Sequence, residues 1–405
     1  MNPSTPQLGL LLTGGGARAA YQVGVLQAIV DLRRRYQPAA EGEIQGSPFS
    51  IICGTSAGAI NAAAVACSAD DFRMAVARLS RVWGHFEAGH VYAADAMSIA
   101  RTGAKWLRSV SLGWLLARSK HFKVTPPRSL LDNSPLGKLL ERAVPLERLS
   151  GLIQQGHLQA LAVTASSYSS GQHVTFYEGV EHLRPWIRSQ RLAVPCNVTR
   201  DHLMASSAIP FIFPAQALPM QNGGTEYFGD GSMRQTAPIA PAIHLGAERI
   251  LVIGAGRMRQ AGETQQPVNA SDYPSLAEIA GHALSSIFLD SLAVDIERIQ
   301  RINQTLSLVP PDKRGNSALK PVELLVIAPS ERVDEIAAEH TRDLPFMVRA
   351  LLGALGVSSA RKKKQRGEAL ASYLLFEAGF TRELMALGRA DAMKQEEALR
   401  KFFGW

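Results

Sequence analysis

The segment 50–61, SIICGTSAGAIN, constrains the fold of this 405-residue chain more than any other. Its first residues are apolar and predict a buried strand, the turn Gly54-Thr55-Ser56-Ala57-Gly58 follows, and the small residues after it predict a helix. Small residues on either side of a serine allow a strained strand-to-helix turn that presents the serine hydroxyl. Ser56 is therefore a candidate nucleophile, with Gly54 and Gly58 giving the turn its room. A close packing of helix and strand without chemistry would show the same pattern.

A second glycine cluster follows an apolar run near the N-terminus, Leu8–Leu12, which is typical of a buried parallel strand. The cluster is Gly14-Gly15-Gly16, and a helical pattern comes directly after it. Successive glycines can turn their N–H groups into one concave surface, and such a surface binds an oxyanion or a phosphate equally well.

Two interpretations of this loop stay open from its residues alone. Gly14, Gly16 and Ala19 fit the dinucleotide-binding pattern G-x-G-x-x-G/A, although no strand about twenty residues further on ends in the acidic residue expected at the ribose. In an acyl-transfer site, the glycine amides would form the oxyanion hole for Ser56, and Arg18 would brace the loop or meet a phosphate on the substrate.

Asp230 is the best candidate for the proton acceptor that a serine nucleophile needs. None of the ten histidines stands in a recognisable motif. The carboxylate of Asp230 lies between Gly229 and Gly231, which permits close approach to another backbone segment. Desolvation and a direct bond to the serine would raise the basicity of a group whose reference pKa is about 3.9. A Gly-Asp-Gly turn without chemistry is the alternative.

Taken together, these segments resemble the three signatures of the patatin-like phospholipases, which are lipid acyl hydrolases with a Ser-Asp dyad. The signatures match in order and spacing, and they are Gly14-Gly15-Gly16-Ala17-Arg18, Gly54-Thr55-Ser56-Ala57-Gly58 and Asp230-Gly231. The resemblance extends through residues 130–136, 204–210 and 213–214, and residues 286–303 and 371–405 resemble a bacterial subgroup.

The resemblance implies a three-layer α/β/α fold with a central, mostly parallel sheet and a helical C-terminal extension. It further implies that Ser56 is the nucleophile, that Asp230 accepts its proton, and that the amides of Gly14–Gly16 with Arg18 form the oxyanion region. No metal or cofactor is implied. Two positions depart from the family pattern, because Ala19 replaces a glycine and Ser232 replaces an alanine or glycine. Both are small residues, so the departures concern loop geometry more than the reaction.

Alternating strand and helix patterns, with 46% hydrophobic residues, predict one large α/β unit. We expect a catalytic domain over residues 1–330 and a helical extension over residues 331–405 packed on it. Alternation in His173–Tyr177 predicts a strand at one edge of the sheet. The expected parallel strands are Gly9–Leu12, Phe49–Cys53, Leu158–Ala165, Arg249–Gly254 and Leu324–Ala328.

Two basic segments point to an anionic surface. Residues of about 92–125 interleave Trp and Leu with Arg and Lys, as expected either for a lid or membrane-touching helix pair or for an ordinary helix packed on the core. Arg361, Lys362, Lys363 and Lys364 form a cluster that would favour anionic lipid headgroups by about 1 kcal/mol per residue. A solvated loop would show the same charge run.

Three cysteines without metal-ligand spacing fit a reducing compartment. The N-terminal residues do not read as a signal peptide, and no apolar run approaches the length of a membrane span. We therefore expect a cytoplasmic protein whose membrane contact is peripheral, with a lipid substrate and no nucleic acid as partner. A nucleotide- or phosphate-binding module and a lipid-surface interaction protein are the alternative functions.

Overall fold

A single mixed sheet organises the chain. The computed structural model describes residues 6–93, 129–221, 223–258, 273–310, 319–354, 356–357 and 368–405. Ten strands of these residues form the sheet in the order β10-β9-β1-β2-β3-β4-β6-β5, and the hairpin β7–β8 joins it through β3. The strands are β1 (Leu8–Leu12), β2 (Ile51–Thr55), β3 (Ala160–Ser167), β4 (His173–Gly179), β5 (Ile187–Arg188), β6 (Arg191–Pro195), β7 (Gln216–Pro219), β8 (Thr225–Asp230), β9 (Arg249–Ile253) and β10 (Glu323–Ile327).

The five strands β10, β9, β1, β2 and β3 run parallel to one another, as the sequence predicts. The prediction that His173–Tyr177 forms an edge strand is wrong, because β4 lies between β3 and β6. The polar residues that made its pattern alternate are buried rather than exposed. His173, for example, is 4% exposed and is paired with the carbonyl oxygen of Gly231.

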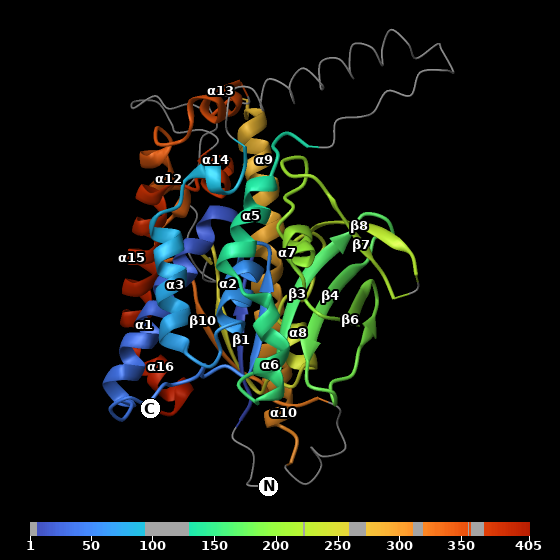
Figure 1. The fold of residues 1–405 in the computed structure, drawn as a ribbon, viewed down its shortest axis with the longest axis vertical. Coiled ribbons are helices and arrows are strands. Elements are labelled where there is room, and N and C mark those ends of the chain that lie inside the picture. Colours follow the sequence, from blue (N-terminus) through green and yellow to red (C-terminus); the bar gives the residue numbers. More distant parts are fainter. Residues whose placement is uncertain are drawn as a thin grey trace.

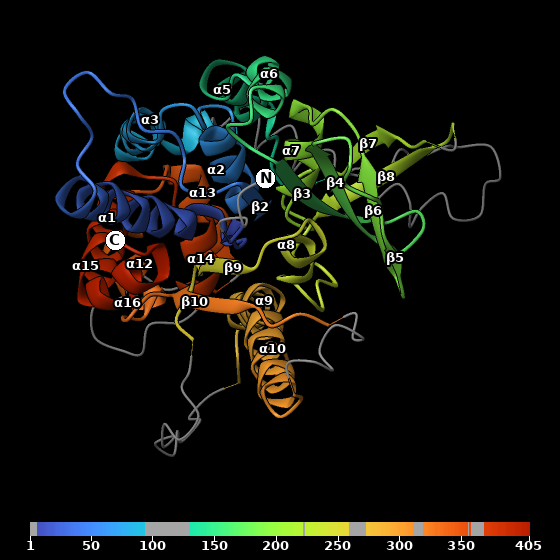
Figure 2. The same ribbon diagram turned by 90° about the horizontal axis from the view of Figure 1, so that it is seen from below.

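Helices cover both faces of the sheet, which confirms the three-layer α/β/α fold. Figure 2 shows α1, α2 and α3 on one side of the sheet and α8 and α10 on the other. Adjacent residues of β1 point to opposite faces: Leu10 and Leu12 belong to the core under α1–α3, and Leu11 belongs to the core under α8 and α10. The helices before β10 are η1 (Gly16–Ala19), α1 (Ala20–Tyr36), α2 (Ala57–Ala66), α3 (Phe72–Gly84), η2 (Ala88–His90), α5 (Ser134–Ala143), η3 (Leu146–Arg148), α6 (Leu149–Gln154), α7 (Arg200–Ser206), α8 (Ala240–His244), α9 (Leu276–Ser285), the π-helical turn η4 (Ser286–Asp290) and α10 (Ser291–Ser307).

The C-terminal helices share the larger of these cores with the N-terminal part of the chain. Phe380 and Leu384 of α15 pack into the same buried cluster as Val25 and Ile29 of α1. In Figure 1 the red helices α15 and α16 lie beside α1. The boundary near residue 330 stays a prediction. These helices are α12 (Val333–His340), α13 (Phe346–Ala354), α14 (Glu368–Leu374), α15 (Ala378–Lys394) and α16 (Glu396–Phe403).

One continuous helical run, Leu276–Ser307, has the length and apolar composition that would allow it to cross a membrane. The sequence reading did not anticipate this run, which joins α9, η4 and α10. Core helices of globular proteins meet the same criterion, and 35% of the apolar window is buried within the protein. Leu292, Ile296 and Ile299 of α10 belong to the core on the second face of the sheet.

Two of the segments singled out from the sequence lie outside the described residues. They are the basic cluster Arg361–Lys364 and the insertion at about 92–125, of which the structure describes Tyr92 and Ala93. The interpretations of both segments stay predictions.

Candidate active site

The sheet register brings Ser56 and Asp230 together. Thr55, the last residue of β2, pairs with Thr164 of β3. The next residue of β3, Ala165, pairs with Asp230 at the end of β8. Ser56 and Asp230 are thus successive neighbours along one edge of β3. The Ser56 hydroxyl donates a hydrogen bond of 2.6 Å to Oδ2 of Asp230, and both residues are buried.

Ser56 occupies the strained turn that the sequence predicts. Its φ of 57° and ψ of −133° lie in a region that residues with a side chain rarely adopt, at a cost of about 1–3 kcal/mol. A Cβ at Gly58 would overlap the carbonyl oxygens of Leu12 and Thr13, so only glycine fits where α2 crosses the end of β1. Gly54 is packed in the same way beneath Ala59. The turn therefore depends on these two glycines for space.

The environment of Asp230 makes its carboxylate more basic than usual. Burial raises the pKa of Asp230 to about 6, because the charged form loses its hydration. Hydrogen bonds from the Ser56 hydroxyl and from the backbone N–H of Ser232, the latter 2.8 Å from Oδ1, act in the opposite direction. A carboxylate with this pKa is mostly ionised at neutral pH and can still accept a proton.

Ser206 forms hydrogen bonds to both the turn at Ser56 and the Asp230-Gly231 turn, a role that the sequence reasoning missed. Its Oγ accepts a hydrogen bond of 2.9 Å from the backbone N–H of Ser56 and donates one of 2.6 Å to the carbonyl oxygen of Thr164. Its own carbonyl oxygen accepts from the N–H of Gly231. The only available signal was its place in the segment 204–210, which resembles the family.

His173 was also missed, because it stood among ten histidines without a motif. Its Nε2 lies 2.8 Å from the carbonyl oxygen of Gly231, so this nitrogen carries the proton. Burial lowers the pKa of His173 to about 4, which keeps the ring neutral at physiological pH. His173 therefore fixes the Asp-Gly turn by a neutral hydrogen bond.

The glycine loop lies beside the turn at Ser56. Within the described ranges, no group of the protein accepts a hydrogen bond from the amides of Gly14, Gly15 or Gly16. Asn61 of α2 donates to the carbonyl oxygen of Ala19, 3.1 Å away, and thereby ties the loop to the helix that follows Ser56. Free N–H groups next to a serine hydroxyl can bind negative charge that develops there.

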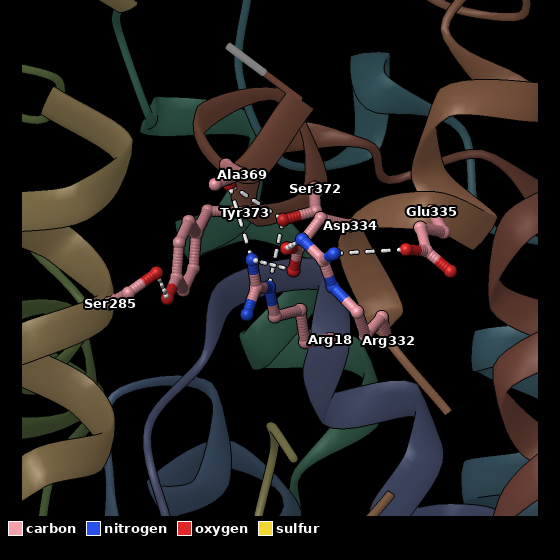
Figure 3. A network of polar contacts seen from close by, with 8 residues as sticks. All are labelled: Arg18, Ser285, Arg332, Asp334, Glu335, Ala369, Ser372 and Tyr373. Carbon is pink, nitrogen blue, oxygen red and sulfur yellow. Dashed lines mark hydrogen bonds and ion pairs between the residues drawn. The ribbon is translucent and has the colours of Figure 1, made fainter. Parts of the chain in front are cut away.

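Arg18 points away from this loop surface toward the C-terminal helices, as Figure 3 shows. It is 2% exposed, and its guanidinium donates to Ser372 Oγ at 2.8 Å and to Asp334 Oδ1 at 3.3 Å. The role of Arg18 in the acyl-transfer interpretation stays a prediction.

An apolar cavity lined by Ser56 runs along α2. About 840 Å³ free of protein atoms lies within and in front of it, open solvent included. The residues that α2 contributes lie on one face of the helix, and α3 and α5 form the opposite walls. The lining residues are Gly16, Ser56, Ala57, Ile60, Ala64, Ser68, Ala75, Arg78, Leu79, Val82, Trp83, Phe86, Val91, Leu136, Leu139, Leu140, Ala143, Val144, Ser207, Ile209, Phe213 and Phe376.

Other reactive groups of the described chain lie apart from this arrangement. In the part of the protein with described coordinates, no group of three or more His, Cys, Asp or Glu side chains is arranged to hold a metal ion. Cys53 and Cys67 are free and buried, and burial raises the pKa of each thiol to about 12.

Comparison with known proteins places the chain in a family. No curated protein matches the sequence. Among solved structures, the chain is similar to VipD from Legionella pneumophila, with 12% identity and a TM-score of 0.32 over 98% of this chain and 67% of that one. It is also similar to the type III effector ExoU, with 13% identity and a TM-score of 0.33 over 98% and 54%. A third similar structure is human GIVD cytosolic phospholipase A2, with 12% identity and a TM-score of 0.40 over 98% and 60%.

The chain thus spans less than two thirds of ExoU and of the human enzyme. The family model of the patatin-like phospholipases matches residues 10–243, which is more than half of the 405 residues and includes the glycine loop, Ser56 and Asp230. The chain therefore belongs to the patatin-like phospholipase family, as its three sequence signatures predict.

Proposed function

We propose that this protein hydrolyses carboxylic esters of lipids with a dyad of Ser56 and Asp230. One observation carries the proposal: the Ser56 hydroxyl lies 2.6 Å from the Asp230 carboxylate, and Ser56 lines an apolar cavity. A hydroxyl in contact with a desolvated carboxylate is the arrangement that activates a serine nucleophile. Membership of the family supports a lipid ester as the substrate.

In the proposed reaction, the Ser56 oxygen attacks the ester carbonyl carbon while Asp230 takes the hydroxyl proton. The carbonyl oxygen becomes an oxyanion, which the amides of Gly14–Gly16 stabilise. Collapse of this intermediate breaks the bond to the alcohol, which leaves with the proton from Asp230, and an acyl group stays on Ser56. Water then attacks the acyl group, gives a proton to Asp230, and releases the fatty acid as the proton returns to Ser56.

The cavity favours a long acyl chain over a small polar one. α2 contains ten residues and is therefore about 15 Å long. An extended chain advances by about 1.1–1.2 Å per bond, as in polypeptide, so a chain of about twelve to fourteen carbons would lie along the helix. Ile60, Ala64 and Leu139 are apolar side chains that are only partly buried at this wall. An acyl chain would cover them.

The same loop can hold a phosphate, but the groups beside it favour the acyl-transfer role. A serine hydroxyl that is hydrogen-bonded to a buried carboxylate at 2.6 Å has no function in dinucleotide binding. The next strand, β2, ends at Thr55 and not at the acidic residue expected at a ribose. Equilibrium binding of NAD(P)H or ATP is the discriminating test, and tight binding without esterase activity would favour the phosphate-binding module.

Hydrolysis of p-nitrophenyl butyrate by wild type, Ser56→Ala and Asp230→Asn tests the function. We expect both variants to lose about three orders of magnitude or more in kcat. Asparagine fits the site of Asp230, because its oxygen can accept from the Ser232 amide while its NH₂ group donates to Ser56 Oγ. Equal rates in the three proteins would refute the enzymatic proposal.

Attachment to an anionic membrane through Arg361–Lys364 stays a prediction beside this function. Flotation with anionic liposomes after neutralisation of Lys362, Lys363 and Lys364 tests it. Loss of flotation with unchanged esterase activity would separate surface binding from catalysis, and unchanged flotation would refute the role of the cluster.

A further inference from the structure

The glycine loop is supported from behind by residues outside the family match, which ends at residue 243. Gly16 has a φ of +55°, and its Cα faces the carbonyl oxygen of Tyr373 near the end of α14. Gly14 faces Ser232 Oγ, which lies within the family match, and the ring of Phe288 in η4. The rings of Phe288 and Tyr373 stack with centroids 5.0 Å apart. The ring of Phe288 and the backbone of Tyr373, both from the second half of the chain, therefore lie directly behind the loop.

Arg18 ties the same loop to α12 and α14, in the network of Figure 3. Its Nε donates to Ser372 Oγ at 2.8 Å, and its Nη2 donates to the carbonyl oxygen of Ala369 and to Asp334, each at 3.3 Å. The guanidinium lies over the ring of Tyr373, 4.1 Å from its centroid. A guanidinium that is 2% exposed and held on these sides has little freedom to turn toward a substrate.

The charge of Arg18 is balanced within this network. Asp334 is shared between Arg18 and Arg332, whose Nη2 lies 3.3 Å from Oδ2. Arg332 also pairs with Glu335 at 3.0 Å. The side chain of Asp334 is 29% exposed, whereas that of Arg18 is 2% exposed, so Asp334 is the member of this ion pair that contacts solvent. The fork of the guanidinium thus joins one residue of η1 to two C-terminal helices.

We propose that Arg18 is a positioning residue through which α12 and α14 hold the glycine loop in the conformation needed for oxyanion binding. The inference rests on the proposed function and concerns the part of the chain beyond the family match. Loss of the contacts would let the loop amides move, and a displacement of about 1 Å at a reacting centre costs about 10²-fold in rate. Substrate binding, which depends on the apolar cavity, would change little.

The double variant Ser372→Ala with Asp334→Asn removes the hydroxyl that accepts from Arg18 Nε and the negative charge that pairs with its guanidinium, without a change in the loop itself. The matched control is Asp31→Asn, which removes the ion pair of 2.8 Å between Arg389 of α15 and Asp31 of α1. This pair also joins a C-terminal helix to the N-terminal part of the chain, but it does not contact the loop. The two substrates are p-nitrophenyl butyrate, which has no phosphate, and lysophosphatidylcholine.

We expect the double variant to lose at least about tenfold in kcat on both substrates with KM within about twofold of wild type, and Asp31→Asn to keep both constants within about twofold. An unchanged kcat in the double variant would overturn the proposal. A loss confined to lysophosphatidylcholine would also overturn it, because Arg18 would then contact the substrate phosphate. An equal loss in the control would show a general effect of the C-terminal helices and have the same consequence.

Amide hydrogen exchange over residues 13–24, which span the loop and the first turn of α1, gives a readout that needs no activity. Faster exchange in the double variant but not in Asp31→Asn supports the proposal, and equal exchange in all three proteins overturns it. If wild type hydrolyses neither substrate, the proposed function fails, and the exchange result still decides whether the C-terminal helices hold the loop.

Discussion

The raised pKa of Asp230 predicts how the activity depends on pH. If Asp230 is the base, only its ionised form activates Ser56, and kcat/KM reports the pKa of the free enzyme. With a pKa of about 6, the ionised fraction is about 90% at pH 7 and about 10% at pH 5. We therefore expect kcat/KM to fall about tenfold over this interval. A carboxylate with its ordinary pKa would lose less than about a tenth of its ionised form.

The assay follows p-nitrophenyl butyrate in buffers of constant ionic strength, with every sample brought to one alkaline pH before the released nitrophenolate is read. Glu368 needs a control, because burial and the nearby Asp334 carboxylate raise its pKa to about 7. In Glu368→Gln, the fall in activity near pH 6 should stay in place. A flat profile between pH 5 and pH 7, with the protein still folded, would refute the assignment of Asp230 as a base with a raised pKa.

The same shift predicts the pH dependence of stability, with the opposite sign from that of a salt-bridged carboxylate. The folded state holds the proton on Asp230 up to a pH of about 6, whereas the unfolded chain loses it near pH 3.8. The contribution of Asp230 to the free energy of unfolding therefore falls by about 3 kcal/mol as the pH rises through this interval. Urea unfolding of wild type and Asp230→Asn between pH 4 and pH 7 measures it. The difference between the two proteins should change with pH, and a constant difference would contradict the shift.

Three substitutions test the surroundings of the dyad. Ala64→Phe would close the cavity about 12 Å from Ser56. Activity on esters with acyl chains longer than about ten carbons should then be lost, while butyrate esters are still hydrolysed. A series of esters of increasing chain length measures this, with Ala77→Phe on the exposed face of α3 as the control. Gly58→Ala forces a Cβ onto two backbone carbonyl oxygens and should cost about 1–3 kcal/mol of stability as well as activity, measured by urea unfolding and ester hydrolysis. Ser206→Ala leaves the buried N–H of Ser56 without its acceptor, so stability should fall by about 1–3 kcal/mol and kcat should fall with it. Wild-type values in Gly58→Ala would refute the close packing at Gly58, and wild-type values in Ser206→Ala would refute the role of this hydrogen bond.

The parts of the site that are local in sequence could be predicted from it. A pattern of a few small residues predicts each of three segments: the turn at Ser56, the glycine loop and the Asp-Gly turn. Small residues are required there because two backbone segments pass close to each other. Their order along an alternating strand and helix pattern was enough to predict the α/β/α fold and the family. That Ser56 would contact Asp230 followed from the resemblance, and the physical cause, the register of β3 against β2 and β8, needs the structure.

The parts that depend on distant contacts could not be predicted. Arg18 and Ser372 are 354 residues apart, and nothing in the local pattern around either indicates the other. His173 lies in a strand whose polar residues alternate, and such alternation is typical of a strand with one solvent-exposed face. The sequence therefore gave no sign that His173 is buried or that it pairs with the carbonyl oxygen of Gly231. The cavity likewise arises from three helices whose apolar residues would be consistent with an ordinary core.

The central claim is that Ser56, activated by Asp230, carries the acyl group. Intact-mass and peptide mass spectrometry after reaction with a fluorophosphonate probe tests it most directly. We predict one adduct, on Ser56. It should form in wild type and in the control Ser80→Ala, which changes a partly buried serine outside the cavity. It should be absent from Ser56→Ala and form much more slowly in Asp230→Asn. An adduct on a different residue, or equal labelling of wild type and Ser56→Ala, would contradict the account.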